Sequence, residues 1–321
     1  MEYTIDYFAS MAEKALAEFK YPDTAAGLYE PIEYAMASGG KRLRPALCLA
    51  TYAALSHSEP SAAINQALAV EMFHNFTLLH DDVMDRADIR RGRPTVHRRY
   101  GENAAILSGD TMLSLAYGLL AQGAGNNFAE LFEVFNRTAI EVYEGQQFDT
   151  EFEKRLDVTV DEYMAMIRLK TSVLLGCACR LGAMMASASS DVCDAFYNYG
   201  VSLGLAFQLQ DDWLDTFGDP AVFGKEIGGD IVNNKKTWLL ITALSEANED
   251  IECLLNDTLE PEEKIAQVKR IYERLDLANR CTELARQYSD KAVEALADIE
   301  LDAKARDFFS LLAAKAATRD H

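Results

Sequence analysis

Proline is scarce in this sequence and cysteine is scattered, and each pattern excludes a class of structure. Only seven prolines occur among 321 residues, with none between Pro94 and Pro220 and none after Pro261. Because proline breaks helix interiors, these long proline-free segments favour helices. The six cysteines form no CxxC pair and no zinc-ligand pattern, so we expect reduced core thiols rather than disulfides. They are Cys48, Cys177, Cys179, Cys193, Cys253 and Cys281.

Positive charge is in short supply, with 31 Lys and Arg residues against 51 Asp and Glu residues and a net charge of −20. A surface this acidic repels nucleic-acid phosphate, so no nucleic-acid partner is expected. The basic residues are nevertheless clustered, at Lys41–Arg44, Arg86–Arg99 and Lys235–Lys236. Local positive clusters in an acidic protein predict a small anionic ligand.

Long apolar runs are also missing. No uninterrupted stretch approaches the roughly 18 residues that a membrane span requires. The longest apolar-looking segment, Ala104–Ala121, contains Asp110 and is interpreted as a buried helix. The first residues have no basic segment followed by an apolar one, so no signal peptide is expected. The chain is therefore predicted to be cytoplasmic and to have no membrane span.

The apolar residues that are present follow a helical period. Leu68, Met72, Phe76 and Leu79 recur at the spacing of one helix face, whereas β-branched alternation is scarce and predicts no convincing strand. Turn signals divide the chain into about ten or more helices, and no low-complexity linker separates its halves. We therefore predict an all-α fold with a single domain over 1–321.

Two copies of a DDxxD pattern carry the strongest chemical signal. In the first, Asp81 and Asp85 are four residues apart and share a helix face, with Asp82 beside them. The second repeats this spacing with Asp211 and Asp215. Crowded carboxylates repel one another, and ligation by oxygen alone suits Mg²⁺ bound together with substrate phosphates. One such pattern alone would more often be a solvated acidic helix face, but two copies that both follow apolar sequence favour metal binding.

The segment Gly39–Pro45 contains two glycines followed by three cations. The glycines permit a tight turn, and Lys41 and Arg44 are spaced to hold one anion together. Taken alone, the segment would be an ordinary basic helix start. His74 lies seven residues before Asp81 and so on roughly the same helix face. A lone helical histidine is usually just packed, but this one is predicted to face the same pocket.

Arg90 and Arg91 follow the first aspartate pattern, where Gly92 and Pro94 end a helix and open a loop. The two arginines point to different sides of their segment, so each could hold a different diphosphate through two hydrogen bonds. Neutralisation of the nearby aspartates is the alternative, and both roles are compatible. Three further lysines are isolated, and each taken singly predicts a surface residue rather than a ligand: Lys170, Lys225 and Lys235.

Several motifs follow one another in a characteristic order between residues 39 and 238. They are GGKRLRP, LLHDDVMDRADIRRG, GQQFD, KTS, FQLQDDWLD, GKEIGGD and NNKKTW. With these motifs the sequence resembles the trans-isoprenyl diphosphate synthase family, which makes farnesyl, geranylgeranyl and longer polyprenyl diphosphates. The resemblance covers nearly the whole chain and is highly specific. It implies the isoprenoid synthase fold, with helices around a central active-site cavity, and a homodimer.

The resemblance also implies roles for individual residues. Three Mg²⁺ ions per active site are expected, held by Asp81, Asp82, Asp85, Asp211 and Asp215. Isopentenyl diphosphate is expected to contact Lys41, Arg44, His74 and Arg91. The allylic diphosphate is expected to contact Arg90, Lys170, Thr171, Gln208, Lys225 and Lys235. The cavity is expected to be lined by Gln146 and Asp149.

These residue types suit a Mg²⁺-dependent, head-to-tail prenyl transfer. Mg²⁺ and basic side chains stabilise the charge that develops on departing pyrophosphate. The allylic cation needs a pocket that excludes water, where the double bond of isopentenyl diphosphate attacks it. Loss of a proton, expected to go to the pyrophosphate itself, completes the reaction. No protein nucleophile is needed.

Product length is expected to depend on residues just before the first aspartate pattern. In the family, the growing chain runs away from that motif and meets side chains about one turn along. Here these are Phe76 and Thr77, with Phe73 one turn deeper. One bulky residue beside a small one, without a two-residue insertion in the motif, resembles enzymes that stop at twenty carbons. Geranylgeranyl diphosphate is therefore the first expectation and farnesyl diphosphate the second.

Other protein classes share parts of this pattern. A longer-chain polyprenyl diphosphate synthase is the main alternative, although it would require both aromatic rings to move aside. A class I terpene cyclase has a DDxxD motif but usually lacks the GGKxxRP segment. A head-to-head synthase would differ in its aspartate motifs, and a regulatory subunit would have lost aspartates that are intact here. A generic acidic helical scaffold predicts no Mg²⁺-linked diphosphate binding.

Overall fold

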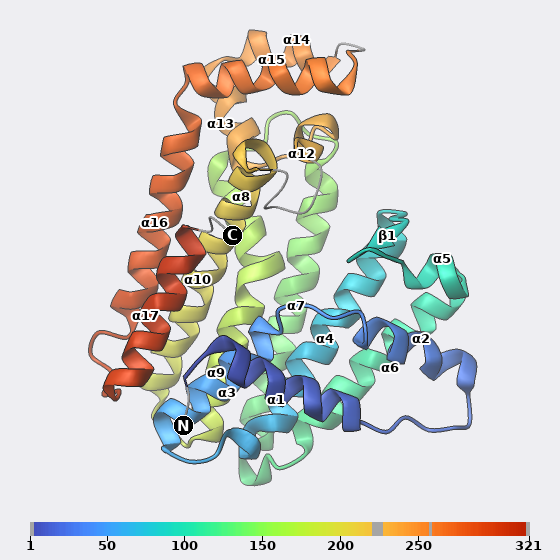
Figure 1. The fold of residues 1–321 in the computed structure, drawn as a ribbon, viewed down its shortest axis with the longest axis vertical. Helices are drawn as coiled ribbons and strands as arrows, with labels where there is room; N and C mark the ends of the chain where they lie inside the picture. Colours follow the sequence, from blue (N-terminus) through green and yellow to red (C-terminus); the bar gives the residue numbers. More distant parts are fainter. Residues whose placement is uncertain (1–2, 220–226, 257–258, 319–321) are drawn as a thin grey trace. The chain divides into compact units, whose positions relative to one another are not determined.

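The computed structural model describes residues 3–219, 227–256 and 259–318 (Figure 1). Apart from one short hairpin, the regular structure in these ranges is helical, which confirms the predicted all-α fold. The chain divides into two compact units. The first comprises Met1–Asn136, Cys177–Tyr197 and Glu300–Ala305, and the second comprises Arg137–Gly176, Asn198–Ile299 and Arg306–His321. The single domain expected over 1–321 stays a prediction.

The first unit is centred on α4. Its elements are α1 (Ile5–Glu18), α2 (Ala26–Met36), α3 (Leu43–Ser56), the 3₁₀ turn η1 (Pro60–Ala63), α4 (Ile64–Met84), α5 (Val96–Tyr100), α6 (Glu102–Ala121) and the 3₁₀ turn η2 (Gly125–Asn127). α4 packs along α6 and against α3. The residues that gave α4 its helical period, Leu68, Met72, Phe76 and Leu79, are all buried. The period therefore predicted the helix correctly, but α4 is buried on every side from Gln66 to Phe73 rather than on one face alone.

α6 is the helix expected in the apolar segment Ala104–Ala121, but it is less buried than predicted. By length and composition it is long and apolar enough to cross a membrane. Only 39% of its most apolar 18-residue stretch is buried. Ile106 and Leu107 are 44% and 58% exposed. α6 therefore packs one side on α4 and presents apolar side chains on another.

A β-hairpin takes the place of the loop predicted after the first aspartate pattern. β1 (Ile89–Arg90) and β2 (Arg93–Pro94) pair antiparallel, with Arg90 opposite Arg93. Arg91 and Gly92 form the two-residue turn and have φ of 52° and 72°, as a type I′ turn requires. This conformation is free for glycine but costs an arginine about 1 kcal/mol or more. Surrounding contacts must therefore hold Arg91 in place.

The second unit is centred on α13. Its elements are α8 (Val160–Ile167), the π-helical turn η3 (Arg168–Ser172), α12 (Gly229–Val232), α13 (Trp238–Glu246), α14 (Asn248–Asn256), α15 (Pro261–Arg274) and α16 (Leu277–Ala295). α13 packs against α8, α14, α15 and α16, and its residues from Trp238 to Leu244 are buried.

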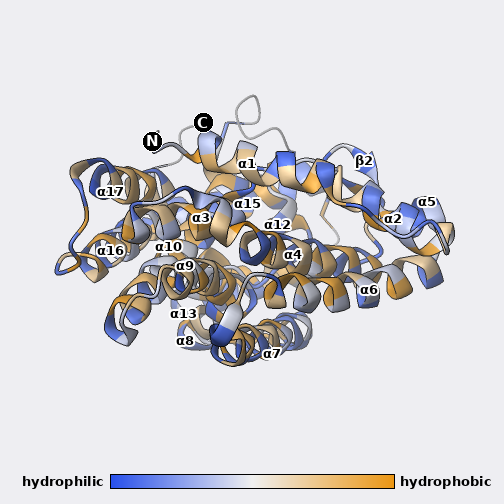
Figure 2. Cartoon of the chain, turned by 90° about the horizontal axis from the view of Figure 1, so that it is seen from below, coloured by the Kyte–Doolittle hydropathy of each residue, from blue (hydrophilic) through white to orange (hydrophobic). Residues whose placement is uncertain are grey.

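Several helices run through the sequence boundaries between the two units. They are α7 (Phe128–Phe152), α9 (Val173–Met185), α10 (Ser190–Phe217) and α17 (Ala303–Ala317). Hydrophobic and hydrophilic residues alternate along most helices of the chain (Figure 2). This is the pattern expected when a helix buries one face and exposes another.

Candidate active site

The first aspartate pattern lies at the carboxyl end of α4. Asp81 is in the last turn and Asp85 is the C-cap, whose backbone N–H donates to the Asp81 carbonyl oxygen at 2.8 Å. This i, i+4 arrangement keeps the two carboxylates close, as predicted. The carboxyl end of a helix carries partial negative charge, so two carboxylates there are unfavourable until a cation binds. The position thus favours a metal ion over an ordinary solvated face.

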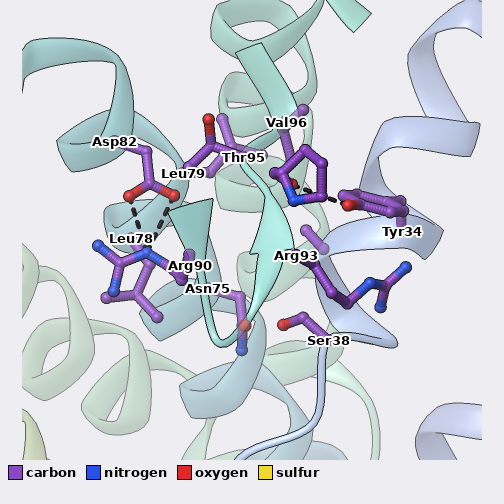
Figure 3. Close-up of a pocket in the computed structure, with 12 residues that line it drawn as sticks. Tyr34, Ser38, Asn75, Leu78, Leu79, Asp82, Arg90, Arg93, Thr95 and Val96 are labelled. Atoms are coloured by element: carbon purple, nitrogen blue, oxygen red, sulfur yellow. Dashed lines mark hydrogen bonds and ion pairs between the residues drawn. The ribbon is translucent and has the colours of Figure 1, made fainter. Parts of the chain in front are cut away.

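Asp82 is buried, unlike its two neighbours in the pattern. It is 4% exposed and accepts hydrogen bonds from Arg90 Nε at 2.8 and 2.9 Å (Figure 3). Burial raises the pKa of Asp82, and Arg90 opposes that shift. The Arg90 side chain is still 35% exposed. The structure thus gives Arg90 the neutralising role that the sequence left open, and it leaves part of the guanidinium accessible.

Basic side chains meet beside two consecutive glycines. Arg44 Nη1 lies 3.2 Å from His74 Nε2. Arg91 Nη1 donates to the carbonyl oxygen of Gly39. A Cβ on Gly40 would lie 2.8 Å from Arg91 Nη1, so only glycine allows this close approach. The structure therefore brings together three of the four residues predicted to hold isopentenyl diphosphate.

Mutual repulsion within this cluster is visible in its pKa values. Burial lowers the pKa of His74 well below its usual value, and Arg44 and Arg91 lower it further. Burial lowers the pKa of Arg44 to about 10, with Glu71 opposing and Arg91 contributing to the shift. Two guanidinium groups beside a neutral imidazole form a site that a diphosphate would stabilise.

Arg42 has a structural role that the sequence did not reveal. Its side chain is 4% exposed and donates to Glu71 Oε1 at 2.5 Å and to the Met36 carbonyl oxygen at 2.6 Å. It also has a positive φ of 44°. These contacts fix the backbone between Lys41, which is exposed, and Arg44, which is partly buried. Three adjacent cations in the sequence thus have three different environments.

Phe73, Phe76 and Thr77 lie on α4 within about two turns of Asp81. The rings of Phe73 and Phe76 are 1% and 6% exposed, and their centroids are 5.5 Å apart. The Phe76 ring also meets the His80 ring edge-on at 4.8 Å. Thr77 is only partly buried beside them. The two aromatic residues form a packed pair, which is compatible with the predicted chain-length floor.

The second aspartate pattern lies at the carboxyl end of α10, in the second unit. Asp211 is exposed and Asp215 is partly buried. Asp215 Oδ2 accepts a hydrogen bond at 2.9 Å from the backbone N–H of Asp230, in the first turn of α12. As in α4, two carboxylates four residues apart occupy the negative end of a helix.

Asp212, between these two residues, was not predicted as a site residue. It is 2% exposed and accepts hydrogen bonds from the Tyr163 hydroxyl, from Gln208 Nε2 at 3.3 Å and from the Trp238 backbone N–H at 3.3 Å. Burial raises the pKa of Asp212 to about 7, against the effect of Lys235. The only sequence signal was its place in the pattern, which is the place that the buried Asp82 occupies in the first copy.

Lys170 and Thr171 lie in the π-helical turn η3. Lys170 forms an ion pair with Asp149, and Thr171 Oγ1 lies 3.4 Å from Gln208 Oε1. A Cβ on Gly145 would lie 2.2 Å from the Lys170 backbone nitrogen, so glycine lets α7 touch this turn. Single π-helical turns occur frequently at functional sites. Here one brings together four of the predicted site residues.

Lys235 belongs to the same group of charges. Burial alone would lower the pKa of Lys235, but the nearby carboxylates of Asp230, Asp212 and Asp149 raise this pKa above its usual value. Lys235 Nζ lies 3.3 Å from Asp230 Oδ1. Gln146 is partly buried on α7, three residues before Asp149. Lys225 lies outside the described residues.

The donor set suits Mg²⁺, although no cage is preformed. Within residues 3–219, 227–256 and 259–318, no three His, Cys, Asp or Glu side chains are arranged to hold a metal ion. Mg²⁺ usually takes one or two carboxylates and completes its shell with water and substrate phosphate. Pairs such as Asp81 and Asp85 therefore fit Mg²⁺ that binds together with a diphosphate.

An all-α fold in which two DDxxD patterns each end a helix, with basic side chains in the same unit, is typical of prenyl-transferring synthases. A family model described as polyprenyl synthetase matches residues 25–275. The chain belongs to this family and is a transferase of prenyl groups. This confirms the resemblance that its motifs indicated.

Individual relatives narrow the comparison. The geranylgeranyl diphosphate synthase of Saccharolobus solfataricus is 42% identical over 274 residues, which cover 83% of this chain and 82% of the relative. The geranylfarnesyl diphosphate synthase of Aeropyrum pernix is 36% identical over 282 residues, which cover 86% and 89%. A crystal structure of a geranylgeranyl pyrophosphate synthase is 41% identical, with a TM-score of 0.93 and 98% of both chains covered.

Proposed function

We propose that this enzyme condenses isopentenyl diphosphate with an allylic diphosphate and releases geranylgeranyl diphosphate. The units are joined head to tail, and each new double bond is trans. The observation that carries the reaction is that each aspartate pattern ends a helix and has basic side chains near it, with Arg90 beside the first pattern and Lys235 beside the second. The twenty-carbon product is supported by the similarity to synthases of that name. Farnesyl diphosphate is the second expectation.

We assign Mg²⁺ to the outer carboxylates of each pattern, with three ions per active site. Asp81 and Asp85 serve one pattern, and Asp211 and Asp215 serve the other. When bound, Mg²⁺ would neutralise charge that develops on the departing pyrophosphate. Asp82 assists by holding Arg90 through its two hydrogen bonds. Asp212 instead accepts hydrogen bonds from Tyr163, Gln208 and the Trp238 backbone, and so orients Gln208 beside the second pattern.

We assign the diphosphate of isopentenyl diphosphate to the cluster beside the glycine turn. Arg44 and Arg91 offer guanidinium groups suited to two-point contact with phosphate oxygens. His74, kept neutral by its surroundings, can donate one hydrogen bond without adding charge. Lys41 is exposed at the edge of this cluster and supplies a further point charge.

We assign the allylic diphosphate to Arg90 and to the basic residues near the π-helical turn. These are Lys170, Thr171, Gln208, Lys235 and the undescribed Lys225. Lys170 is now paired with Asp149, and Lys235 with Asp230. Arriving phosphate oxygens would share or replace these carboxylates as partners. Gln146 and Asp149 are assigned to the wall of the same cavity.

Chain elongation is proposed to stop against Phe76, with Phe73 behind it and Thr77 beside it. The packed ring pair offers a rigid barrier, because moving Phe76 would disturb its contacts with Phe73 and His80. A longer product is the alternative, because one relative is a geranylfarnesyl diphosphate synthase. Product analysis separates the two directly.

We also propose that the protein is a cytoplasmic homodimer. The exposed apolar side chains Ile106 and Leu107 on α6, with Phe132 on α7 41% exposed, are suited to cover the same surface of a second copy. Light scattering behind size-exclusion chromatography tests this, and a mass of one chain at micromolar concentration would refute it.

The experiment that tests the reaction uses purified protein with isopentenyl diphosphate and dimethylallyl, geranyl or farnesyl diphosphate. Each mixture is run with Mg²⁺ and with EDTA, and product length is measured by chromatography. A Mg²⁺-dependent twenty-carbon product is expected. A longer product would keep the reaction and refute the floor at Phe76. No elongation from any starter by folded protein would refute the proposed function.

A further inference from the structure

Arginines from other parts of the chain cap the carboxyl end of α2. The last turn of α2 has no basic residue of its own. At the helix end, the Met36 carbonyl oxygen accepts from Arg42 Nη2 at 2.6 Å and the C-cap Ala37 carbonyl oxygen accepts from Arg93 Nη1 at 3.1 Å. In the loop just beyond the helix, the Gly39 carbonyl oxygen accepts from Arg91 Nη1. The last carbonyls of a helix lack intrahelical partners and carry partial negative charge, so guanidinium groups stabilise them. Two of these arginines come from the β-hairpin.

Arg93 also docks the hairpin on an aromatic ring. Its guanidinium carbon lies 4.1 Å from the centroid of the Tyr34 ring, and the guanidinium carbon of Arg99 lies 4.4 Å from the same centroid. Tyr34 is 9% exposed, and its hydroxyl donates to the Pro94 carbonyl oxygen at 2.7 Å (Figure 3). Cation–π contacts of this kind strengthen when the ring is shielded from water. β2 is therefore held to α2 by several independent contacts.

The docked strand restricts the turn that precedes it. Arg93 is paired across the hairpin with Arg90, and two like charges in that position would destabilise the pair if neither had a partner. Arg90 is tied to Asp82 on α4, while Arg93 is tied to α2. Held on both sides, Arg91 stays in its costly positive-φ conformation and reaches the carbonyl oxygen of Gly39.

We infer that Arg93 is a positioning residue that docks β2 on α2 and thereby holds the Arg91 guanidinium where it meets the diphosphate of isopentenyl diphosphate. The inference rests on the proposed function. Arg93 itself is occupied by the Ala37 carbonyl oxygen and by the Tyr34 ring, so it acts through Arg91. Lysine would keep the charge at this position but lose the flat contact with Tyr34.

The test compares the steady-state kinetics of Arg93→Ala with those of a matched control, Arg98→Ala. Arg98 is 51% exposed and pairs with the exposed Asp88, so its removal takes one positive charge from the same region without undocking β2. Arg93→Ala should raise KM for isopentenyl diphosphate about tenfold, with kcat and KM for the allylic diphosphate within about twofold. Arg98→Ala should leave all three within about twofold.

A double variant separates positioning from general damage. Because Arg93 acts through Arg91, adding Arg93→Ala to Arg91→Ala should change KM for isopentenyl diphosphate by less than about twofold more. Tyr34→Phe removes only the hydroxyl that donates to the Pro94 carbonyl oxygen. It should raise KM for isopentenyl diphosphate by a smaller factor than Arg93→Ala. Melting curves of every variant show whether the fold is kept.

Several results would overturn the inference. A role exerted through Arg91 would be contradicted if Arg93→Ala leaves KM for isopentenyl diphosphate unchanged or raises KM equally for both substrates. It would also be contradicted if Arg93→Ala raises this KM by the same factor in the Arg91→Ala background as in the unmodified enzyme. If the unmodified enzyme forms no prenyl product, the proposed function fails and the inference fails with it. If that enzyme is active and Arg93→Ala behaves like Arg98→Ala, the inference alone fails.

Discussion

Replacing Gly40 with alanine should selectively weaken the binding of isopentenyl diphosphate. A Cβ at this position would lie 2.8, 2.9 and 3.0 Å from three atoms of the Arg91 guanidinium, which is closer than side chains tolerate. The guanidinium would have to leave the Gly39 carbonyl oxygen and the adjacent diphosphate position. A hydrogen bond to a charged group contributes about 1.5–3 kcal/mol, so KM for isopentenyl diphosphate should rise about 10- to 150-fold.

Gly39→Ala is the matched control for this prediction. Gly39 and Gly40 have φ of 75° and 130°, so alanine strains the backbone at either position. A Cβ on Gly39, however, would meet nothing within 4 Å. Both variants should lose about 1 kcal/mol of stability, but only Gly40→Ala should displace Arg91.

The assay measures initial rates with isopentenyl diphosphate varied at saturating Mg²⁺ and allylic diphosphate, together with thermal melting. KM should rise in Gly40→Ala and stay within about threefold in Gly39→Ala, a difference of less than 1 kcal/mol for the control. Adding Gly40→Ala to Arg91→Ala should change KM little further. Equal KM values for the two single glycine variants would refute the reasoning, because Arg91 would then not contact the substrate from this position.

The remaining predictions concern the carboxylates, the floor and the buried thiols. Asp81→Asn should lower kcat by about 100-fold or more, since one charged ligand oxygen of the metal site is lost, whereas Asp88→Asn on the exposed hairpin edge should change kcat little. Phe76→Ala should lengthen the product and lower the free energy of unfolding by about 3–5 kcal/mol, whereas Phe8→Ala should lower stability alone. Burial raises the pKa of the Cys179 thiol to about 12. The stability that this protonated thiol contributes should therefore be fully present below pH 9 and should be lost between pH 9 and 12. The contribution of this thiol to the slope is about 1.4 kcal/mol per pH unit, and Cys179→Ala should remove it.

Each of these predictions has a result that contradicts it. Near-normal turnover by Asp81→Asn would exclude that carboxylate as a metal ligand. An unchanged product distribution in Phe76→Ala would place the floor elsewhere. For the thiol, denaturant unfolding at several pH values should show a shallower alkaline slope in Cys179→Ala, and identical slopes would mean that another group controls it.

The helices could be predicted because their signals are local. Leu68, Met72 and Phe76 lie at a helical spacing, and the same residues are buried on α4. The aspartate spacing likewise fixed which carboxylates share the end of one helix. The positions of Lys170 and Asp149 followed only from the family resemblance, yet the structure brings them together as an ion pair.

The parts that could not be predicted depend on contacts between distant residues. The β1–β2 hairpin has only two residues per strand, too few to show an alternating pattern, and α2 and α4 hold it in place. Nothing in the local sequence distinguishes Arg42 from its neighbours, because its burial depends on Glu71, which is 29 residues away. The close approach of α7 to the turn at Lys170 requires the missing side chain of Gly145, which lies in another helix. The pKa of Asp212 follows from burial that its neighbours in sequence do not reveal.

The arginine-capped end of α2 also has a consequence for how the chain folds. The contact of Met36 with Arg42 spans only 6 residues, whereas the contact of Ala37 with Arg93 spans 56, and the contact of Gly39 with Arg91, just beyond the helix, spans 52. Contacts that close long loops form more slowly than local ones, so this end of α2 should acquire its full set of partners late. A diphosphate that binds only after this step favours the completed state over the unfinished one. The substrate would then act as a late stabiliser of the folded chain, in addition to being consumed by it.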